Sequence, residues 1–301
     1  MTDIATRTPP TEVLFPEGTL HAKARVQRVE HDADGRLLLV TDRTPFHPLD
    51  HTWPDQPADR GTVVFGGTRH TVIDAVTGAV GPGAVGPGAE ELLTGGDIPV
   101  RRGDPDWSFV VVHVLDRPED GTAPPAVGQE VDLAVDGEHR AGLSAGHSAC
   151  HLVSLALNER TADLWSKKPP RLDCLGNPDF DQTAIAESRI LPYGSVDRYR
   201  LGKSLRKAGF AAAVLAERLA ELQDAVNGQV AAWIAAGGAA RIDREESHLS
   251  ARRWWTCDLP SGRARIPCGG THVASTADLG SVTVTLDLSP GELTVRTRVA
   301  P

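Results

Sequence analysis

The segment HSACHLVSLALNERTADLWS, from His147 to Ser166, marks the point at which the chain changes character. Its apolar residues recur with helical rather than alternating spacing, so we predict a helix that begins after Gly146. The preceding sequence alternates as β-strands do, whereas the following sequence mixes helical and strand-like runs. We therefore place a boundary near Ala141 and predict two domains, at residues 12–140 and 141–301. The length of 301 residues agrees with this division, because it exceeds the usual size of one hydrophobic core.

Short β-rich runs separated by turn residues fill the N-terminal half, from Leu20 to about Val135, and predict an antiparallel β-barrel or β-sandwich. The runs span residues 24–30, 36–42, 62–65, 70–75, 109–115 and 130–135. The turn sequences DADG at 32–35 and GGTR at 66–69 predict two hairpins. The repeated VGPGA at 80–84 and 85–89 predicts an exposed loop, because Pro and Gly at this density oppose both helix and sheet.

The C-terminal half combines helices with strands and predicts a mixed α+β domain, which makes the fold class of the whole chain α+β. A second long helix is expected at 211–236, with a kink at Asn227-Gly228. The Pro- and Asp-rich stretch 168–195 predicts no definite element. Strands are expected at 252–257, 263–267, 281–288 and 292–299, and the last two form a hairpin across Ser289-Pro290-Gly291.

Four side chains in two short motifs indicate a metal site. His147 and His151 are four residues apart on the predicted helix, so one face carries both, about 6 Å apart along the axis. Taken alone, this pair also fits two histidines that simply hydrogen-bond their neighbours. Cys268 and His272 add a thiolate and an imidazole across a Gly-Gly turn, where glycine permits backbone angles that other residues resist. Three nitrogens and one sulfur are the donors that Zn²⁺ prefers in tetrahedral geometry, so we predict a zinc site.

The same motifs carry a family resemblance. HSACH at 147–151, followed by CGGTHV at 268–273, resembles the HxxxH and CxGTHV motifs of alanyl-tRNA synthetase editing domains, the related threonyl-tRNA synthetase domain and stand-alone AlaX-type editing proteins. In that family these four positions hold zinc. The resemblance implies a barrel domain followed by a zinc-binding editing domain. It also implies an ATP-independent hydrolase that cleaves the ester of a mischarged aminoacyl-tRNA, of the alanyl-tRNA-editing type, or of a related small aminoacyl substrate.

The N-terminal half shares part of a second family motif. DRTPFHP at 42–48 and QPADRG at 56–61 resemble its two flanks, but the family usually has Glu-Gly-Gly-Gly between them. Here LDHTWPD, at 49–55, contains no glycine and is three residues longer. Since this loop faces the editing site in the family, the resemblance implies that 49–55 reshapes the pocket or adds polar groups. The alternative is a lengthened surface loop that does not contact substrate.

The resemblance also supplies candidate site residues beyond the metal ligands. The candidate catalytic residues are Gln56 and Thr271, and the candidate substrate-binding residues are Thr44, His51, Asp55, Gly269 and Gly270. Thr271 either lends its hydroxyl or backbone N–H to the substrate or stabilises the turn. Zinc either acidifies a bound water, polarises the carbonyl or orients the substrate, and the sequence leaves these roles open. Four protein ligands leave no open coordination position unless the coordination expands or a ligand leaves.

A net charge of −9 gives the chain no overall attraction to a polyanion, so contact with nucleic acid requires a local basic patch. The candidate residues lie in DRYRLGKSLRKAG: Arg198, Arg200, Lys203, Arg206 and Lys207. We expect them to contact phosphates of a tRNA acceptor end, with Tyr199 stacked on a terminal base. The alternative is a solvated linker before the long helix.

The four cysteines lie far apart and include no C-x-x-C pair, which favours reduced thiols or a metal ligand over disulfides. We expect Cys150 to be a small buried thiol rather than a ligand, and Cys174 and Cys257 to be packed. Trp254 and Trp255 are expected in a core or interface. The first dozen residues lack a signal-peptide pattern, and the apolar runs fall far short of the roughly 20 residues that span a bilayer. We therefore expect a cytoplasmic protein with no membrane partner.

Three functions fit these features. The first is a zinc-dependent hydrolase acting on aminoacyl-tRNA or a small aminoacyl ester. The second is an aminoacyl-tRNA-dependent transferase that passes the acyl group to a small-molecule acceptor other than water, which the altered 49–55 loop motivates. The third is a non-catalytic binding protein stabilised by its metal. The sequence does not identify the amino acid recognised or the oligomeric state.

Overall fold

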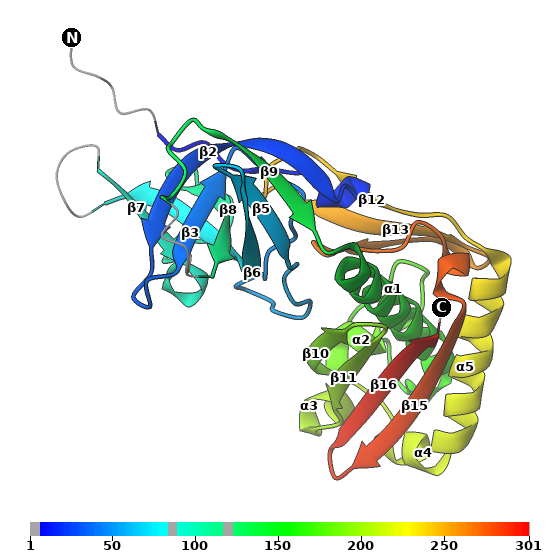
Figure 1. Cartoon of the computed structure of the whole chain (residues 1–301). Helices are drawn as coiled ribbons and strands as arrows, with labels where there is room; N and C mark the ends of the chain where they lie inside the picture. The colour runs from blue at the N-terminus through cyan, green and yellow to red at the C-terminus, as the bar shows by residue number, and fades with distance from the viewer. Residues whose placement is uncertain (1–6, 84–88, 117–122, 301) are drawn as a thin grey trace. The chain divides into compact units, whose positions relative to one another are not determined.

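The computed structural model describes residues 7–83, 89–116 and 123–300 and forms two compact units (Figure 1). The first unit runs to Arg140 and also contains Arg244–Arg252, and the second contains Ala141–Asp243 and the chain from Arg253 onward. The segment 244–252 thus packs with the N-terminal half, although it lies within the range 141–301 of the predicted second domain. Among the described residues, every helix is too short or too polar to cross a membrane.

Six strands of the first unit pair antiparallel into a closed ring, in the order β5-β9-β2-β3-β8-β6 and back to β5. They are β2 (His21–His31), β3 (Leu37–Thr41), β5 (Gly61–Phe65), β6 (Thr68–Pro82), β8 (Ser108–Leu115) and β9 (Glu130–Val135). Strand β7 (Glu90–Thr94) pairs with the far part of β6. Strand β8 pairs with β3 and β6, and it is buried along its whole length because alternate side chains enter two hydrophobic clusters, Phe109 and Val111 in one and Val110 and Val112 in the other.

Both predicted hairpins of this unit are confirmed. Strands β2 and β3 flank the first turn, where Gly35 has φ 75°. The second turn, between β5 and β6, contains only Gly66 and Gly67, at φ 58° and 80°. Two consecutive positive φ angles are typical of a two-residue hairpin turn, which explains why this turn is shorter than the four residues of GGTR.

The exposed loop predicted from residue 80 is wrong for Val80–Pro82. These residues belong to β6, where Gly81 pairs with Glu91, and Val80 is fully buried. A Cβ atom at Gly81 would lie 2.3 Å from the indole of Trp107, so glycine serves close packing here rather than a turn. Residues 84–88, which contain most of the second repeat, lie outside the described residues.

Shorter elements complete the first unit. They are β1 (Glu12–Val13), which pairs parallel with β4 (Arg43–Thr44), and the 3₁₀ helices η1 (Phe15–Glu17) and η2 (Gly95–Asp97). The returning segment 244–252 joins them through a backbone hydrogen bond of 3.0 Å from Leu249 to Thr11. A buried ion pair between Arg140 and Asp59 fixes the end of this unit, and Arg140 also donates to the carbonyl of Pro45 at 2.7 Å.

The second unit is built on a four-stranded antiparallel sheet in the order β10-β11-β16-β15. These strands are β10 (Ile185–Leu191), β11 (Gly194–Arg200), β15 (Ser281–Ser289) and β16 (Glu292–Ala300). One core contains the inward side chains of the sheet and those of α1 (Gly137–Arg160) and α5 (Leu219–Ala236). A second sheet has the order β12-β13-β14, formed by Ala240–Arg244, Arg253–Leu259 and Gly262–Pro267. The remaining helices are η3 (Ala162–Leu164), α2 (Phe180–Ala184), α3 (Lys203–Lys207), α4 (Ala212–Glu217) and η4 (Thr276–Leu279).

The predicted strands and the final hairpin of this half are confirmed, but the helix boundaries need correction. Helix α1 begins at Gly137, not after Gly146, because the Asp136 carboxylate accepts hydrogen bonds from the backbone of Glu138 and His139 at 3.1 Å. The long helix predicted at 211–236 is interrupted at Arg218. It does not break at Asn227, whose side-chain amide donates to the carbonyl of Val284 at 2.9 Å and accepts from its N–H at 2.8 Å.

Candidate metal centre

Four potential metal ligands converge in the second unit. His147 and His151 lie one turn apart on α1, and Cys268 and His272 lie on the turn that follows β14. Their four ligand atoms all lie within 4.8 Å of one another. The Cys268 Sγ is 3.4 Å from Nε2 of His147 and 3.3 Å from Nε2 of His272. The structure therefore brings together all four residues that the two motifs singled out.

Burial keeps the imidazoles of His147 and His151 neutral. It lowers the pKa of His147 to about 3, and burial together with the neighbouring His147 lowers the pKa of His151 well below its usual value. A neutral imidazole has the free lone pair that metal ligation requires. The Nε2 atom of His151 is buried and has no hydrogen-bond partner among the described residues. An unpaired buried polar atom is costly, and a cation held by all four side chains would satisfy it, so the donor set fits zinc.

Two further groups hold the ligands in place. The Ser148 hydroxyl accepts a hydrogen bond of 3.1 Å from the backbone of Val273 and lies 3.2 Å from Nδ1 of His272. This contact leaves Nε2 of His272 facing Cys268. The backbone N–H of Gly270 lies 3.5 Å from Sγ of Cys268. No sequence pattern indicates Ser148, because its role depends on the segment that lies opposite the helix.

Gly269 and Gly270 form their turn without left-handed backbone angles. Neither Gly269 nor Gly270 is among the residues with positive φ. A Cβ atom at Gly269 would lie 3.6 Å from the guanidinium of Arg253, which is itself only 7% exposed. Thr271 is buried, and its hydroxyl accepts a hydrogen bond of 2.9 Å from Ser144. Arg253 and Ser144 are thus two neighbours of the motif that no sequence pattern indicated.

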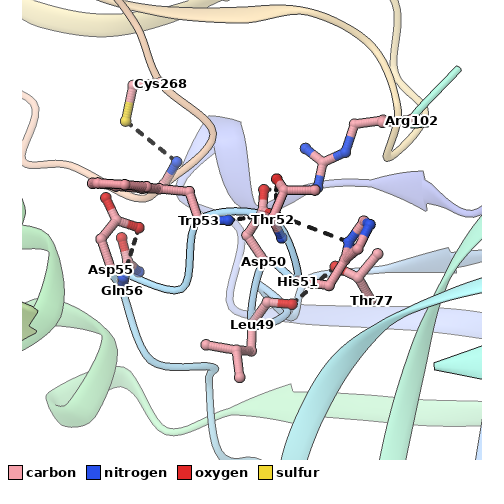
Figure 2. Close-up of polar contacts among 11 residues, drawn as sticks. Leu49, Asp50, His51, Thr52, Trp53, Asp55, Gln56, Thr77, Arg102 and Cys268 are labelled. Atoms are coloured by element: carbon pink, nitrogen blue, oxygen red, sulfur yellow. Dashed lines mark hydrogen bonds and ion pairs between the residues drawn. The ribbon is translucent and has the colours of Figure 1, made fainter. Parts of the chain in front are cut away.

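Hydrogen bonds within the loop 49–55 of the first unit, and to neighbouring residues, hold the loop in place (Figure 2). Asp50 accepts hydrogen bonds from the backbone and hydroxyl of Thr52, and Arg102 donates to its carboxylate at 2.7 Å. The carbonyl of Leu49 accepts from the backbone and hydroxyl of Thr77 at 3.2 and 2.9 Å. Of the candidate substrate residues, His51 has a side chain that is 8% exposed, and burial lowers its pKa.

The pKa of the Asp55 carboxyl is unusually high for a loop residue. Burial raises its pKa from 3.8 to about 6, although hydrogen bonds such as the one from the backbone of Gln56 oppose that rise. For Asp50, burial acts in the same direction, but Arg102 and the Thr52 donors outweigh it and lower the pKa. The two carboxylates of this loop therefore ionise in different pH ranges, Asp50 at lower pH than Asp55.

Gln56 and Thr44 lie inside the first unit. Gln56 is 1% exposed, and Thr44 is fully buried. The Thr44 hydroxyl lies 2.7 Å from Nε2 of His113, and it accepts from the backbone of Phe46 at 3.1 Å. Burial lowers the pKa of His113 to about 4. The sequence analysis did not single out His113, whose Nδ1 lies 3.0 Å from the carbonyl of Leu39.

The predicted nucleic-acid residues lie on regular elements rather than on a solvated linker. Arg198 and Arg200 lie on β11, and Lys203, Arg206 and Lys207 lie on α3. All five are exposed. The stacking role predicted for Tyr199 is wrong, because alternation along β11 points this residue inward. It is 1% exposed, and its hydroxyl donates to Asp181 at 2.8 Å.

All four cysteines are free thiols. Cys257 is buried as expected, whereas Cys174 is exposed and the packing prediction for it is wrong. The Cys150 thiol lies 3.5 Å from the carboxylate of Asp197 and is not part of the ligand cluster, as predicted. Trp255 is 1% exposed, and its ring centroid lies 5.0 Å from that of His151.

Comparison with known proteins points to aminoacyl-tRNA synthetases. The chain is 32% identical over 147 residues to an alanine–tRNA ligase of Caldivirga maquilingensis and 32% identical over 156 residues to that of Aromatoleum aromaticum. The matches cover 48% and 52% of this chain but 12% and 16% of the ligases, so the chain spans a small part of the length of these relatives. About half of the chain is therefore related to part of an alanyl-tRNA synthetase.

The other comparisons do not identify a family. The chain matches no protein-family model. A solved structure described as "Crystal structure of fusion DH domain" covers 92% of both chains at 12% identity, with a TM-score of 0.12.

Proposed function

We propose that the protein is a zinc-dependent hydrolase that cleaves the ester of an aminoacyl-tRNA, of the alanyl-tRNA-editing type, or of a related small aminoacyl compound. The observation that carries the proposal is the cluster of three imidazoles and one cysteine, with ligand atoms within 4.8 Å of one another. The similarity to alanine–tRNA ligases supports an aminoacyl substrate. We propose a barrel domain at 12–140 and an editing-type domain at 141–301 as the two parts of this enzyme.

The cluster would hold zinc through His147, His151, Cys268 and His272. When bound, zinc supplies a Lewis acid that can polarise an ester carbonyl or acidify water. The chain's own groups then orient the substrate. The hydrogen bond from Ser144 fixes the hydroxyl of Thr271 beside the ligands, which supports a catalytic role for Thr271. The backbones of Gly269 and Gly270 lie on the same turn and are proposed substrate contacts.

Further candidate site residues lie in the first unit. We propose His51 and Asp55 as substrate contacts and Gln56 as a catalytic residue, on the family resemblance of the flanking motif. The hydroxyl of Thr44 is engaged with His113, which supports a positioning role for it.

Incubation with a panel of charged tRNAs tests the proposal. We expect the zinc-loaded protein to deacylate at least one mischarged tRNA, and chelation or Cys268→Ala to abolish this activity. Cys174→Ser is the matched control, because it removes an exposed thiol outside the cluster. If the zinc-loaded protein deacylates none of the tRNAs and no small aminoacyl ester, the proposal is wrong.

A second candidate is transfer of the acyl group to an acceptor other than water. The observation that favours it is the loop 49–55, where a polar, hydrogen-bonded turn replaces the family's glycines. Product analysis in the presence of amines and alcohols decides between the two, because a transferase yields an amide or a new ester and a hydrolase yields the free amino acid. A third outcome, unfolding on chelation without turnover of any substrate, would indicate a binding protein.

A further inference from the structure

The four-stranded sheet of the second unit has one covered face and one open face (Figure 1). Alternate residues such as Val284 and Val295 are buried in the core shared with α1 and α5. The residues between them, such as Thr285 and Arg296, are exposed. Because successive side chains of a strand point to opposite faces, the exposed set lies on a single face.

This open face concentrates arginine. Five of its exposed side chains are Arg189, Arg198, Arg200, Arg296 and Arg298. Arg189 and Arg198 share Glu187, at 2.8 and 3.2 Å, and Arg296 pairs with Asp287 at 3.3 Å. Arg200 and Arg298 have no carboxylate within ion-pair distance among the described residues. In a chain of net charge −9, the face is a local excess of positive charge.

The strand register places the backbone positions of these arginines at regular intervals. Arg298 lies opposite Thr283, and Arg296 lies opposite Thr285. Residues two apart on a strand are about 6.8 Å apart, which is comparable with the spacing of neighbouring phosphates along an extended nucleic-acid strand. Arginine forks suit phosphate oxygens, because they offer paired donors in a fixed plane.

A hollow at one end of the face combines this charge with apolar groups. Its volume is about 590 Å³, and its lining includes Leu191, Tyr193, Thr283, Arg296 and Arg298. Tyr193 has φ 58°, a left-handed conformation that is unfavourable for a non-glycine residue. Backbone hydrogen bonds of 2.8 Å, one to Gly142 and one from Val299, hold it there. Tyr193 lines the hollow together with Arg296 and Arg298, and its ring also packs against helix α1 at Gly142.

We infer that this open face binds the phosphate backbone of RNA, with the hollow lined by Arg296 and Arg298 as part of the binding surface. The inference rests on the proposed function in that the RNA is the tRNA of the substrate, and it assigns that RNA to a defined surface. The sequence analysis indicated only Arg198 and Arg200 on this face. Arg189, Arg296 and Arg298 join them because β10, β11 and β16 are neighbours in the sheet.

Fluorescence anisotropy with a labelled 12-nucleotide single-stranded RNA, and with an uncharged tRNA transcript, tests the surface. The test variant is Arg296→Gln/Arg298→Gln. The control is Arg241→Gln/Arg263→Gln, which removes two arginines of similar exposure from the other sheet of this unit. We expect the test variant to bind RNA about tenfold more weakly, and its salt dependence, log K against log salt, to be shallower by about 1.4. The control should bind as the wild type does.

A second variant tests the hollow and serves as a control for misfolding of the double variant. Thr285→Glu places a negative charge on the exposed face without changing the core, so it should weaken RNA binding while the thermal midpoint and zinc content stay at wild-type values. Equal affinity and salt slope in wild type and Arg296→Gln/Arg298→Gln would overturn the inference, and so would equal losses in test and control variants. Displacement of the RNA by poly-glutamate at equal charge concentration would also overturn it, since the face would then be a general anion surface.

Binding of uncharged RNA is independent of catalysis, so the two proposals fail separately. If the wild type deacylates tRNA but the variants bind RNA normally, only the assigned surface is wrong. If the variants lose RNA binding while the wild type deacylates nothing, only the proposed hydrolase is wrong.

Discussion

Ser148 shows how a residue outside the ligand set can control a metal site. Its hydroxyl bridges the backbone of Val273 and the Nδ1 of His272, so it fixes the ring whose Nε2 faces the cluster. Partners of this kind orient a ligating imidazole and set its hydrogen position. We expect Ser148→Ala to weaken zinc affinity by about 10- to 100-fold. Competition with a fluorescent zinc chelator measures the change.

The control for this variant lies on the same helix. The hydroxyl of Ser154 donates to the backbone carbonyl of His151 at 3.0 Å and contacts no ligand ring, so Ser154→Ala should retain wild-type affinity. Equal zinc affinities for the two variants would show that Ser148 does not orient His272.

The two carboxylates of the 49–55 loop predict opposite effects of pH on stability. Burial raises the pKa of Asp55 from 3.8 to about 6, so the folded state holds this proton more tightly than the unfolded state does. Asp55 therefore costs stability increasingly as the pH rises from about 4 through 6. We expect Asp55→Asn to raise the free energy of unfolding at pH 7 by up to about 3 kcal/mol, and to leave it nearly unchanged at pH 3.5.

Asp50→Asn supplies the contrasting control. Arg102 and Thr52 lower the pKa of Asp50, so its carboxylate contributes stability above its usual pKa that is lost as the pH falls. The Asn variant should be less stable than wild type at pH 7, and the difference should shrink in acid. Denaturant unfolding across pH 3.5–8 measures both variants, and parallel curves for wild type and Asp55→Asn would contradict the prediction.

At the scale of elements, helix α1 depends on close contact with the β10–β11 turn. A Cβ atom at Gly146 would lie 2.4 Å from the carbonyl oxygen of Leu191 and 2.5 Å from that of Gly194. Both atoms belong to backbone, so the helix itself has to move. We expect Gly146→Ala to destabilise the protein by about 2 kcal/mol or more, as overpacking does, and to weaken zinc binding because His147 is the next residue.

Gly228 provides a matched comparison, because it lies within helix α5 and a Cβ atom there would meet nothing within 4 Å. Gly228→Ala should therefore stabilise the protein by about 0.5–1 kcal/mol through helix propensity. Thermal unfolding and zinc titration distinguish the two variants. A neutral effect of Gly146→Ala on both would show that the approach of α1 to the turn is not required.

The sequence predicted those elements whose signal is local. The hairpins at 32–35, 66–67 and 289–291 carry their own turn residues, and the strands beside them alternate. The stretch 168–195 could not be assigned, because the inward side chains of its strand β10 and of the adjoining β11 are partly polar. Asp197 is 2% exposed and accepts hydrogen bonds of 2.6 and 2.7 Å from Ser188 and Ser195. A buried polar network of this kind removes the hydrophobic period on which strand prediction depends.

In the candidate site, too, the residues with a local sequence signal could be predicted and the others could not. The four ligands could be predicted, because each motif places two donors at a spacing that chemistry restricts. The groups around them could not, since Ser144, Ser148 and Arg253 acquire their roles only from segments more than a hundred residues away or from the opposite strand. Residue type alone does not predict the backbone of the Gly-Gly turn, because neither Gly269 nor Gly270 adopts the positive φ that glycine permits.

For the whole molecule, net charge and the distribution of charge lead to different expectations. The value of −9 argued against nucleic acid, yet the open face of one sheet gathers five arginines from three strands. Long-range charge is screened within about 8 Å at physiological salt, so a bound polyanion senses the local face more than the total. In a protein of this size, a negative net charge therefore does not exclude the binding of nucleic acid.

Removing the metal should affect one unit of the molecule and spare the other. All four ligands belong to the second unit, where they connect α1 to the turn after β14. A ligand that binds only the folded state stabilises it by about 2.7 kcal/mol at a concentration of 100 times Kd. We expect chelation to speed amide hydrogen exchange in α1 and in β13–β14, while the buried strand β8 of the first unit exchanges at an unchanged rate. Mass spectrometry with and without chelator measures this, and Cys268→Ala should show the chelated pattern even with zinc added. A uniform increase in exchange across both units would contradict a metal that acts within the second unit alone.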